Sequence, residues 1–296
     1  MLSTKAKIRI ARALNIAIVG ARSFLGRPSV VEVRRAGVNW RLALNEGIDL
    51  GLYLGSYQNF SKRVLESWVR PGGLIVDIGA NIGAHTLRMA DRIGAGGRVV
   101  AIEPTDYAFA KLSANAQLNP DLLDRLVLVQ AALTDGCTNA SQKEFYSRWS
   151  LHAQGADRHR KHFGYLESAR GARFVSLDVL LGQLRAAGRI SGPVTFVKLD
   201  VDGHELEVLR GGRATFTSDR PAVLIEIAPN VQDEVPGRFE DVIGTLESYG
   251  YQLENDRSGQ PLPMHAAGLR KLIRQGASID AIARPRQTEN HRPTGP

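Results

Sequence analysis

The most informative segment of the sequence is Val76-Asp77-Ile78-Gly79-Ala80-Asn81-Ile82-Gly83-Ala84-His85-Thr86. An apolar run, residues 74–76, leads into it, and an amphipathic stretch that ends near Ile93 follows it. This order predicts a buried strand, a tight loop and the first turn of a helix. Gly79 and Gly83 allow a sharp bend and the close approach of a ligand, and the free N–H groups of the following helix point towards that ligand. The segment therefore predicts a binding site for a nucleotide-like molecule.

Strand and helix patterns alternate along the rest of the chain. Apolar strands are expected at five places, residues 74–77, 98–103, 126–133, 194–200 and 223–227. Amphipathic helices between them are typical of a parallel sheet with helical crossovers. Residues 251–253 and 279–283 are expected to close the sheet as an antiparallel pair. The predicted fold class is therefore α/β, with a Rossmann-like, mostly parallel sheet and helices on both faces.

The first expected strand ends in a carboxylate. Asp77 precedes a loop of the form Asp77-x-Gly79-x-Asn81-x-Gly83, which differs from the Gly-x-Gly-x-x-Gly loop of dinucleotide sites. A pyrophosphate would be repelled by Asp77, whereas a ligand with an ammonium group, a sulfonium and no phosphate would be attracted. We therefore expect S-adenosylmethionine as the cofactor. An NAD-dependent dehydrogenase is the weaker alternative.

Two further acids follow the next expected strands. Glu103, just before Pro104, ends the second strand, where a carboxylate can accept hydrogen bonds from both hydroxyls of a ribose. Asp135 follows the third strand and can accept a hydrogen bond from an adenine amino group. Each acid also has a simpler interpretation, because Glu103 suits a helix N-terminus and Asp135-Gly136 suits a turn.

The fourth expected strand runs into Lys198-Leu199-Asp200-Val201-Asp202-Gly203-His204-Glu205. In an open parallel sheet, ligands lie at the carboxyl ends of the strands near the topological switch point, which the first and fourth strands should flank. We therefore expect Asp200 and His204 beside the methyl donor. Asp202 and Glu205 instead fit an N-cap and its capping-box partner.

Residues 45–255 resemble the FkbM family of methyltransferases. Besides the motifs of the first and fourth strands, the resemblance rests on Ile102-Glu103-Pro104, Ala132-x-x-Asp135, Leu177-Asp178 and Leu224-Ile225-Glu226-Ile227. Two departures are conservative, since Asp202 replaces a more frequent Glu and Leu199 a more frequent Ile. The resemblance implies a class I fold with seven strands, the last antiparallel, and usually O-methylation of a hydroxyl on a sugar, polyketide or similar metabolite. The predicted cofactor-binding residues are Asp77, Gly79, Ala80, Asn81, Gly83, Glu103, Pro104, Asp135 and Asp200.

Methylation of a sugar or aliphatic hydroxyl needs help from the protein, because such a hydroxyl is a weak nucleophile. A base or a metal ion must take its proton. We predict His204 as the base, since its unperturbed pKa lies near the working pH. Asp200 would orient His204, hold the hydroxyl or contact the cofactor. In a less favoured scheme, Asp200 holds Mg²⁺ together with Asp202 or Glu226.

Recognition of the acceptor is expected from residues 45–60 and 147–172, which should border the strand ends. The second segment is polar and poorly periodic, as functional loops of this length often are, although a surface loop without function is an almost equal alternative. Its stacking surfaces and hydrogen-bond donors are Trp149, His152, His159, His162 and Tyr165. The three histidines lack the nearby acids and regular spacing that a metal site would need.

The positive net charge of +8 is concentrated at the two ends of the chain. Residues 1–41 carry a net charge of +8 and residues 284–296 carry +2, which leaves −2 for residues 42–283. A domain that grips a nucleic-acid backbone usually has a basic face, so we expect no nucleic acid as substrate. The predicted organisation is a basic extension over 1–41, helical with short strands, a methyltransferase domain over 42–283, and a disordered tail over 284–296.

The N-terminal residues 1–28 are basic and partly apolar. Their apolar run is shorter than the run of about 18 residues that a membrane span needs. An exported signal peptide is disfavoured because Asn15 interrupts the apolar run. The remaining interpretations are an ordinary cationic helix or a helix with weak membrane-surface contact. The single cysteine, Cys137, fits a reducing, cytoplasmic location. A non-catalytic scaffold at a membrane surface is the alternative to an enzyme; the acceptor and the oligomeric state do not follow from the sequence.

Overall fold

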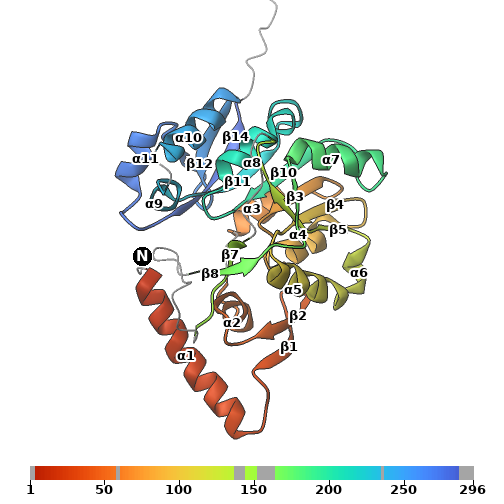
Figure 1. Cartoon of the computed structure of the whole chain (residues 1–296), viewed down its shortest axis with the longest axis vertical. Coiled ribbons are helices and arrows are strands. Elements are labelled where there is room, and N and C mark those ends of the chain that lie inside the picture. The colour runs from red at the N-terminus through yellow and green to blue at the C-terminus, as the bar shows by residue number, and fades with distance from the viewer. Residues whose placement is uncertain (1–3, 58–60, 137–143, 152–163, 235–236, 287–296) are drawn as a thin grey trace, which may run out of the picture.

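The computed structural model describes residues 4–57, 61–136, 144–151, 164–234 and 237–286. Its centre is an eight-stranded sheet in the order β13-β12-β14-β11-β10-β3-β4-β5 (Figure 1). The strands are β3 (Leu74–Ile78), β4 (Arg98–Ile102), β5 (Leu126–Val129), β10 (Val194–Leu199), β11 (Ala222–Ile227), β12 (Tyr251–Asn255), β13 (Pro261–Leu262) and β14 (Ile279–Pro285). The predicted α/β class is confirmed.

The pairing within the sheet is parallel from β11 through β10, β3 and β4 to β5. The strand β14 is antiparallel to both of its neighbours, β11 and β12, as the expected closing pair requires. The sheet has eight strands instead of the expected seven, because the two-residue β13 pairs with the edge of β12. The topological switch lies between β3 and β10, where the chain order of neighbouring strands reverses.

Helices cover both faces of the sheet. Leu74, Val76 and Ile78 share a core with α7 (Leu177–Ala186), α8 (Glu205–Gly211) and α10 (Arg238–Ser248). Because side chains of a strand alternate between faces, Ile75 lies on the other face, in a core with α4 (Thr86–Ile93). Ala101 packs there against α5 (Asp106–Gln117). Shorter helices that the sequence analysis did not predict are α6 (Pro120–Leu123), η1, a π-helix (Thr215–Asp219), α9 (Pro229–Gln232) and α11 (Ala266–Leu272).

The third expected strand, residues 126–133, is interrupted. The chain leaves the main sheet at Gln130, whose Nε2 donates to the Asp106 Oδ1 at 2.6 Å. Beyond it, β6 (Ala131–Leu133) pairs with β9 (Arg173–Val175) in a separate parallel ladder. The prediction of one continuous strand was therefore wrong, and the break coincides with a hydrogen bond from Gln130 to Asp106 of α5, 24 residues earlier in the chain.

The segment expected to be an irregular loop, 147–172, is partly a hairpin. The strands β7 (Glu144–Arg148) and β8 (Tyr165–Ser168) pair with each other in an antiparallel ladder. Neither strand of this hairpin joins the main sheet. His152, His159 and His162 lie outside the described residues.

The N-terminal region begins with the long helix α1 (Thr4–Phe24). It is followed by the hairpin of β1 (Val30–Arg35) and β2 (Val38–Ala43), then α2 (Gly47–Tyr53) and α3 (Lys62–Ser67). The hairpin contributes Trp40 and Leu42 to the core shared with α4, while α1 projects along its outer side (Figure 1). The expected domain boundary after residue 41 falls inside β2. Arg284 and Pro285, expected to begin the tail, belong to β14, and residues 287–296 are outside the described part.

Candidate active site

The ends of β3 and β10 touch each other directly at the switch point. Gly79, which follows β3, has φ +76°, and a Cβ atom at this position would lie 1.9 Å from the carbonyl oxygen of Asp200. Only a glycine allows the two backbones to come this close. The Nζ of Lys198 reinforces the contact by donating to the Gly79 carbonyl oxygen at 2.8 Å. The predicted loop is thus tightly joined to the fourth main strand.

Lys198 is the central cation of this junction, and the sequence analysis did not single it out as a site residue. Its side chain is 5% exposed, with Nζ 3.3 Å from the Asp200 Oδ2 and 3.6 Å from the Asp77 Oδ1. Burial alone would lower the pKa of Lys198, but the charges of Asp200 and Asp77 outweigh burial and raise it. Lys198 is therefore charged and neutralises the carboxylates around it.

Asp77 lies beneath the loop. It is fully buried, and its Oδ2 accepts a hydrogen bond from the Thr86 hydroxyl at 2.6 Å at the start of α4. Burial raises the pKa of Asp77, and the Lys198 charge and the Thr86 hydrogen bond oppose that effect. Asp77 therefore links β3 to α4 through the hydrogen bond from Thr86, and it forms an ion pair with Lys198 of β10.

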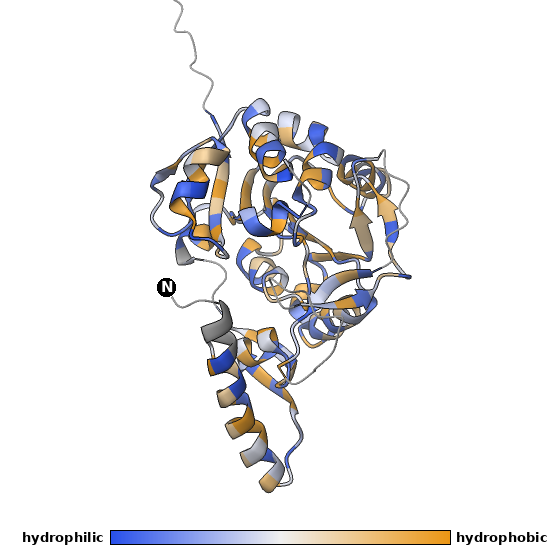
Figure 2. Ribbon diagram, turned by 60° about the vertical axis from the view of Figure 1, so that its left-hand side comes forward, coloured by the Kyte–Doolittle hydropathy of each residue, from blue (hydrophilic) through white to orange (hydrophobic). Residues whose placement is uncertain are grey.

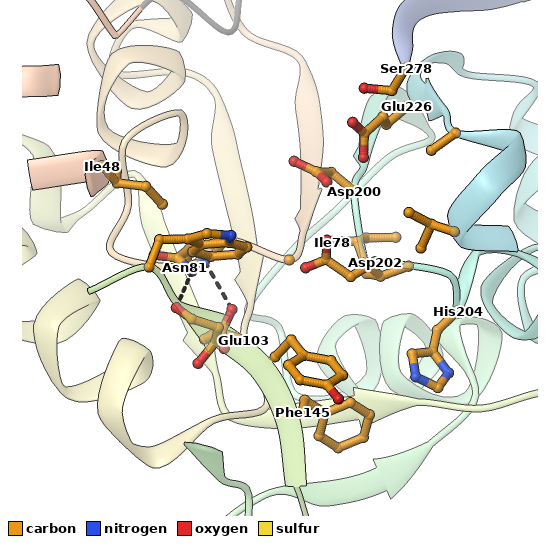
Figure 3. Close-up of a pocket in the computed structure, with 18 of the residues that line it drawn as sticks. Ile48, Ile78, Asn81, Glu103, Phe145, Asp200, Asp202, His204, Glu226 and Ser278 are labelled. Atoms are coloured by element: carbon orange, nitrogen blue, oxygen red, sulfur yellow. Dashed lines mark hydrogen bonds between the residues drawn. The ribbon is translucent and has the colours of Figure 1, made fainter. Parts of the chain in front are cut away.

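A cavity of about 1080 Å³ lies above the carboxyl ends of β3, β4, β10 and β11 (Figure 3). This is the place where ligands bind in open α/β sheets. Seven predicted site residues line the cavity: Gly79, Ala80, Asn81, Glu103, Pro104, Asp200 and His204. Three others, Asp77, Gly83 and Asp135, are not among the described residues that line it. A Cβ atom at Gly83 would meet the Leu112 side chain at 2.8 Å, so this glycine serves the packing of the loop on α5.

Glu103 forms one wall of the cavity together with Asn81. Its Oε2 accepts the backbone N–H of Asn81 at 2.9 Å (Figure 3). Its Oε1 accepts the hydroxyl of Thr105 at 2.6 Å. Burial raises the pKa of Glu103, and these hydrogen bonds oppose the shift. Asn81 has φ +49° and donates its side-chain amide to the Ser147 carbonyl oxygen at 2.9 Å. The Glu103 carboxylate is therefore held in one orientation by two residues, Asn81 in the loop after β3 and Thr105 just before α5.

Acids gather on the opposite wall, above β10 and β11. Asp200, Asp202 and Glu226 line the cavity, and Asp280 is the register partner of Glu226 on β14. Burial, together with the Asp200 charge, raises the pKa of Glu226 to about 8 and that of Asp280 to about 7. Burial and Asp200 also raise the pKa of Asp202 well above its ordinary value. Part of this cluster is therefore protonated at neutral pH.

No group of three or more His, Cys, Asp or Glu side chains in the described ranges is arranged to hold a metal ion.

Asp202 has φ +49° and lies in the turn before α8. Asp202 was predicted to be the N-cap of α8, but His204 occupies that position. The prediction for Asp202 was therefore wrong. Glu205 nevertheless accepts a backbone hydrogen bond from Gly203 at 3.2 Å.

His204, at the N-cap of α8, lines the same cavity as Asp200. Its ring is edge-on to Phe145 of β7, with centroids 5.5 Å apart. Burial lowers the pKa of His204, so its imidazole is neutral at pH 7. Figure 3 shows the His204 ring directed towards Phe145 and away from Asp200, and the described residues include no hydrogen bond between the two. The expected pair is brought into one cavity but not into contact.

The two segments expected to recognise the acceptor meet over the cavity. The N–H of Gly47 donates to the Trp149 carbonyl oxygen at 2.9 Å, and the N–H of Leu151 donates to the Asn45 carbonyl oxygen at 2.9 Å. Arg148 and Glu46 form an ion pair across the same two segments, with the Arg148 Nε 2.9 Å from the Glu46 Oε1. The lining residues from these segments are Gly47, Ile48, Tyr57, Ser147, Trp149, Ser150 and Leu151, and Phe145 and Tyr146, just before the second segment, also line the cavity. Tyr165, in β8, is not among them.

Comparison with known proteins agrees with this geometry. Residues 77–253 match the family model described as the methyltransferase FkbM domain. Because the match covers more than half of the chain, the protein belongs to the FkbM methyltransferase family. No curated protein sequence matches it significantly.

Several solved structures resemble the chain at low sequence identity. A methyltransferase FkbM from Methylobacillus flagellatus KT is 16% identical, with a TM-score of 0.41, over 72% of this chain and 44% of that one. Aeropyrum pernix fibrillarin with bound S-adenosyl-L-methionine is 15% identical, with a TM-score of 0.41, over 86% and 82% of the two chains. A SAM-dependent methyltransferase from Aquifex aeolicus is 13% identical, with a TM-score of 0.36, over 75% and 87%. This chain thus spans less than half the length of the Methylobacillus protein.

Proposed function

We propose that this protein is an S-adenosylmethionine-dependent O-methyltransferase that acts on a hydroxyl of a sugar, a glycan or a secondary metabolite. The observation that carries the proposal is the cavity at the switch point, which has an oriented carboxylate, Glu103, on one wall and a neutral imidazole, His204, on the other. Family membership favours this activity over an NAD-dependent dehydrogenase.

The residues of the cavity suit the cofactor. Gly79, Ala80 and Asn81, in the loop that follows β3, line the cavity and offer a surface on which the cofactor can lie. Glu103 keeps acceptor capacity towards the cavity, because a carboxylate has about four lone-pair sites and three protein hydrogen bonds are made to it. Its proposed partner is the ribose. Asp200, whose side chain is 38% exposed, is the proposed partner of the cationic methionine portion.

The protein's own contribution to the reaction is positioning and proton transfer. S-adenosylmethionine, when bound, supplies an electrophilic methyl group on a sulfonium. His204, neutral because burial lowers its pKa, accepts the proton of the acceptor hydroxyl. The hydrogen-bonded segments 45–47 and 149–151 hold the acceptor side of the cavity in place and align the hydroxyl. Trp149 and Tyr57 provide aromatic surface for a sugar or another ring.

We further propose that the acceptor is not a nucleic acid and that the reaction takes place in the cytoplasm. Residues 42–283 have a net charge of −2, and acids dominate the cavity wall at Asp200, Asp202 and Glu226. The excess of Lys and Arg that would hold a phosphate backbone is missing from this part of the chain. The single cysteine, Cys137, suits a reducing compartment. Mg²⁺ held by Asp200 with Asp202 or Glu226 remains the less favoured alternative to His204.

One calorimetric experiment tests the class of activity. The protein is titrated with S-adenosylhomocysteine and, separately, with NAD. Binding of S-adenosylhomocysteine alone supports the proposal, binding of NAD alone contradicts it, and binding of neither identifies a scaffold. Methyl uptake from labelled cofactor into sugar, glycan and polyketide acceptors then identifies the acceptor class. Turnover that survives exhaustive chelation eliminates the Mg²⁺ scheme.

A further inference from the structure

The helix α1 has apolar residues on two sides, of which the inner one packs on the protein core through Ile18 and Val19. On its inner side, Asn15 is fully buried and donates its side-chain amide to the Leu44 carbonyl oxygen at 2.5 Å. Its outer side carries apolar residues at spacings of four and three. We call this outer row the apolar ridge; its members are Ile10, Leu14, Ala17, Ala21 and Phe24.

The apolar ridge is open to solvent along its whole length. Ile10 is 49% exposed, Leu14 is 43% exposed and Phe24 is 91% exposed. Leu25, which is 63% exposed, continues the ridge beyond the end of the helix. Figure 2 shows these apolar turns on a helix that projects from the body of the molecule. Single exposed apolar residues are ordinary, but a continuous row over several turns marks an interaction surface.

The charge around the apolar ridge is entirely positive. Residues 1–31 contain six Lys or Arg and no Asp or Glu. Arg9 and Arg27 are exposed near the two ends of the ridge. An apolar strip on a helix with cationic and no anionic side chains is complementary to an anionic lipid surface. It is not complementary to a second copy, because two such helices would bring only positive charges together.

We propose that α1 docks along an anionic membrane surface, with the apolar ridge at the boundary between headgroups and acyl chains. The helix would lie in the plane of the interface, since none of the described helices is long and apolar enough to cross a membrane. The exposed side chains of Arg9 and Arg27, near the two ends of the ridge, would contact lipid phosphates and carboxylates. The proposal does not depend on the proposed methyl transfer.

Docking in this way would bring the cavity close to the lipid. Ala11 lines the cavity and lies beside Asn15 on the inner side of α1, across the helix from the apolar ridge. One helix, about 10–12 Å thick with its side chains, would therefore separate the cavity lining from the membrane surface. An acceptor carried on a lipid would reach the cavity without leaving the interface.

The experiment is vesicle flotation of the full chain. One set of vesicles is phosphatidylcholine alone, and the other contains about 30% phosphatidylglycerol, an anionic lipid. The variants Leu14→Ser and Phe24→Ser, which add no charge, shorten the apolar ridge. Val179→Ser on α7 is the matched control, because Val179 is also a helical apolar residue and is 51% exposed.

We expect wild-type protein to bind the anionic vesicles at least about 10-fold more tightly than the neutral ones, and more weakly at high salt. Phe24→Ser and Leu14→Ser should each weaken binding several-fold, roughly in proportion to the apolar area removed, while Val179→Ser should bind like wild type. Wild-type circular dichroism and urea unfolding of the variants show that they are folded.

Three outcomes overturn the proposal. Wild-type protein that floats with neither set of vesicles contradicts it directly. Equal binding by wild type and the ridge variants would place the lipid contact elsewhere on the molecule. A stable dimer in light scattering that Phe24→Ser dissociates, without vesicle binding, would assign the ridge to a second copy of the chain. None of these results depends on whether methyl transfer occurs.

Discussion

The carboxylate of Glu103 accepts the backbone N–H of Asn81 across 2.9 Å, and this hydrogen bond joins the end of β4 to the loop that follows β3. Asn81 has a left-handed backbone, φ +49°, which few residues adopt without a compensating contact. The acid thus holds the loop and faces the cavity at the same time. Its removal should affect the cofactor site before it affects the fold.

We expect Glu103→Gln to weaken the binding of S-adenosylhomocysteine. A hydrogen bond to a charged group contributes about 1.5–3 kcal/mol, so the dissociation constant should rise by roughly 10- to 100-fold in calorimetry. Glu240→Gln, on the exposed side of α10, is the matched control and should bind like wild type. An unchanged dissociation constant for Glu103→Gln would remove Glu103 from the proposed cofactor site.

Gly79→Ala should destabilise the fold more than an ordinary glycine substitution. The new Cβ would collide with the Asp200 carbonyl oxygen and would also require a left-handed alanine. Gly72→Ala is the control, because Gly72 has nearly the same φ, +77°, with open space around it. In urea unfolding we expect a loss of about 1–2 kcal/mol for Gly72→Ala and of about 3 kcal/mol or more for Gly79→Ala. Equal losses would show that the contact with Asp200 has no energetic consequence.

Lys198→Met should be strongly destabilising, because it leaves the buried Asp77 carboxylate without its cation. Breaking a buried pair in this way costs about 3–5 kcal/mol. The double variant Lys198→Met, Asp77→Asn should recover part of that loss in the same unfolding measurement. Arg210→Ala breaks an exposed pair with Asp241 and should cost less than about 1 kcal/mol. A double variant no more stable than Lys198→Met would contradict the pairing.

His204→Ala should lower kcat by about 100-fold or more, the usual contribution of a general base, while the affinity for S-adenosylhomocysteine stays the same. Because burial lowers the pKa of His204, the wild-type kcat should be constant above the ordinary histidine pKa and should fall only at more acidic pH, as the imidazole gains a proton. His265→Ala, an exposed helix cap, is the control. Unchanged turnover in His204→Ala would eliminate the base role.

Glu226→Gln should stabilise the protein at alkaline pH. Burial raises the folded-state pKa of Glu226 to about 8 from an ordinary value of 4.5. Between these values the unfolded chain loses the proton while the folded chain keeps it, so stability declines as pH rises through this window, and above pH 8 the folded state carries the full cost of the charge. Relative to wild type, Glu226→Gln should gain at least about 1 kcal/mol at pH 9 and little at pH 4. A pH-independent difference would show that Glu226 does not titrate in this way.

The local sequence pattern was sufficient to predict much of the fold. The apolar runs that end at Asp77, Glu103 and Asp200 become β3, β4 and β10, and the closing pair β12 and β14 is antiparallel as expected. These predictions succeed because strand periodicity and punctuating glycines act over a few residues. The interruption at Gln130 could not be seen, since the hydrogen bond that coincides with it reaches Asp106 in a different element.

The site was predicted less completely than the fold. Lys198 was overlooked because its partner Asp77 faces it only through the register of β10 with β3, and register is not encoded in the local pattern. The lysine within the buried run Phe196-Val197-Lys198-Leu199 was nevertheless a usable signal, since lysine is almost never buried without a partner. Phe145 and the junction of residues 45–47 with 149–151 depend on long-range contacts in the same way.

The backbone contact between Gly79 and Asp200 has a consequence for how the enzyme can change. It joins the donor side of the cavity into one rigid part, in which almost any substitution would disturb both strands. The acceptor side is built from separate segments, 45–57 and 144–151, which meet the rest mainly through exchangeable side chains and a few backbone hydrogen bonds. If the proposed function holds, new acceptors can therefore evolve, or be selected in a library, by varying those two segments, while the backbone contact between Gly79 and Asp200 stays unchanged.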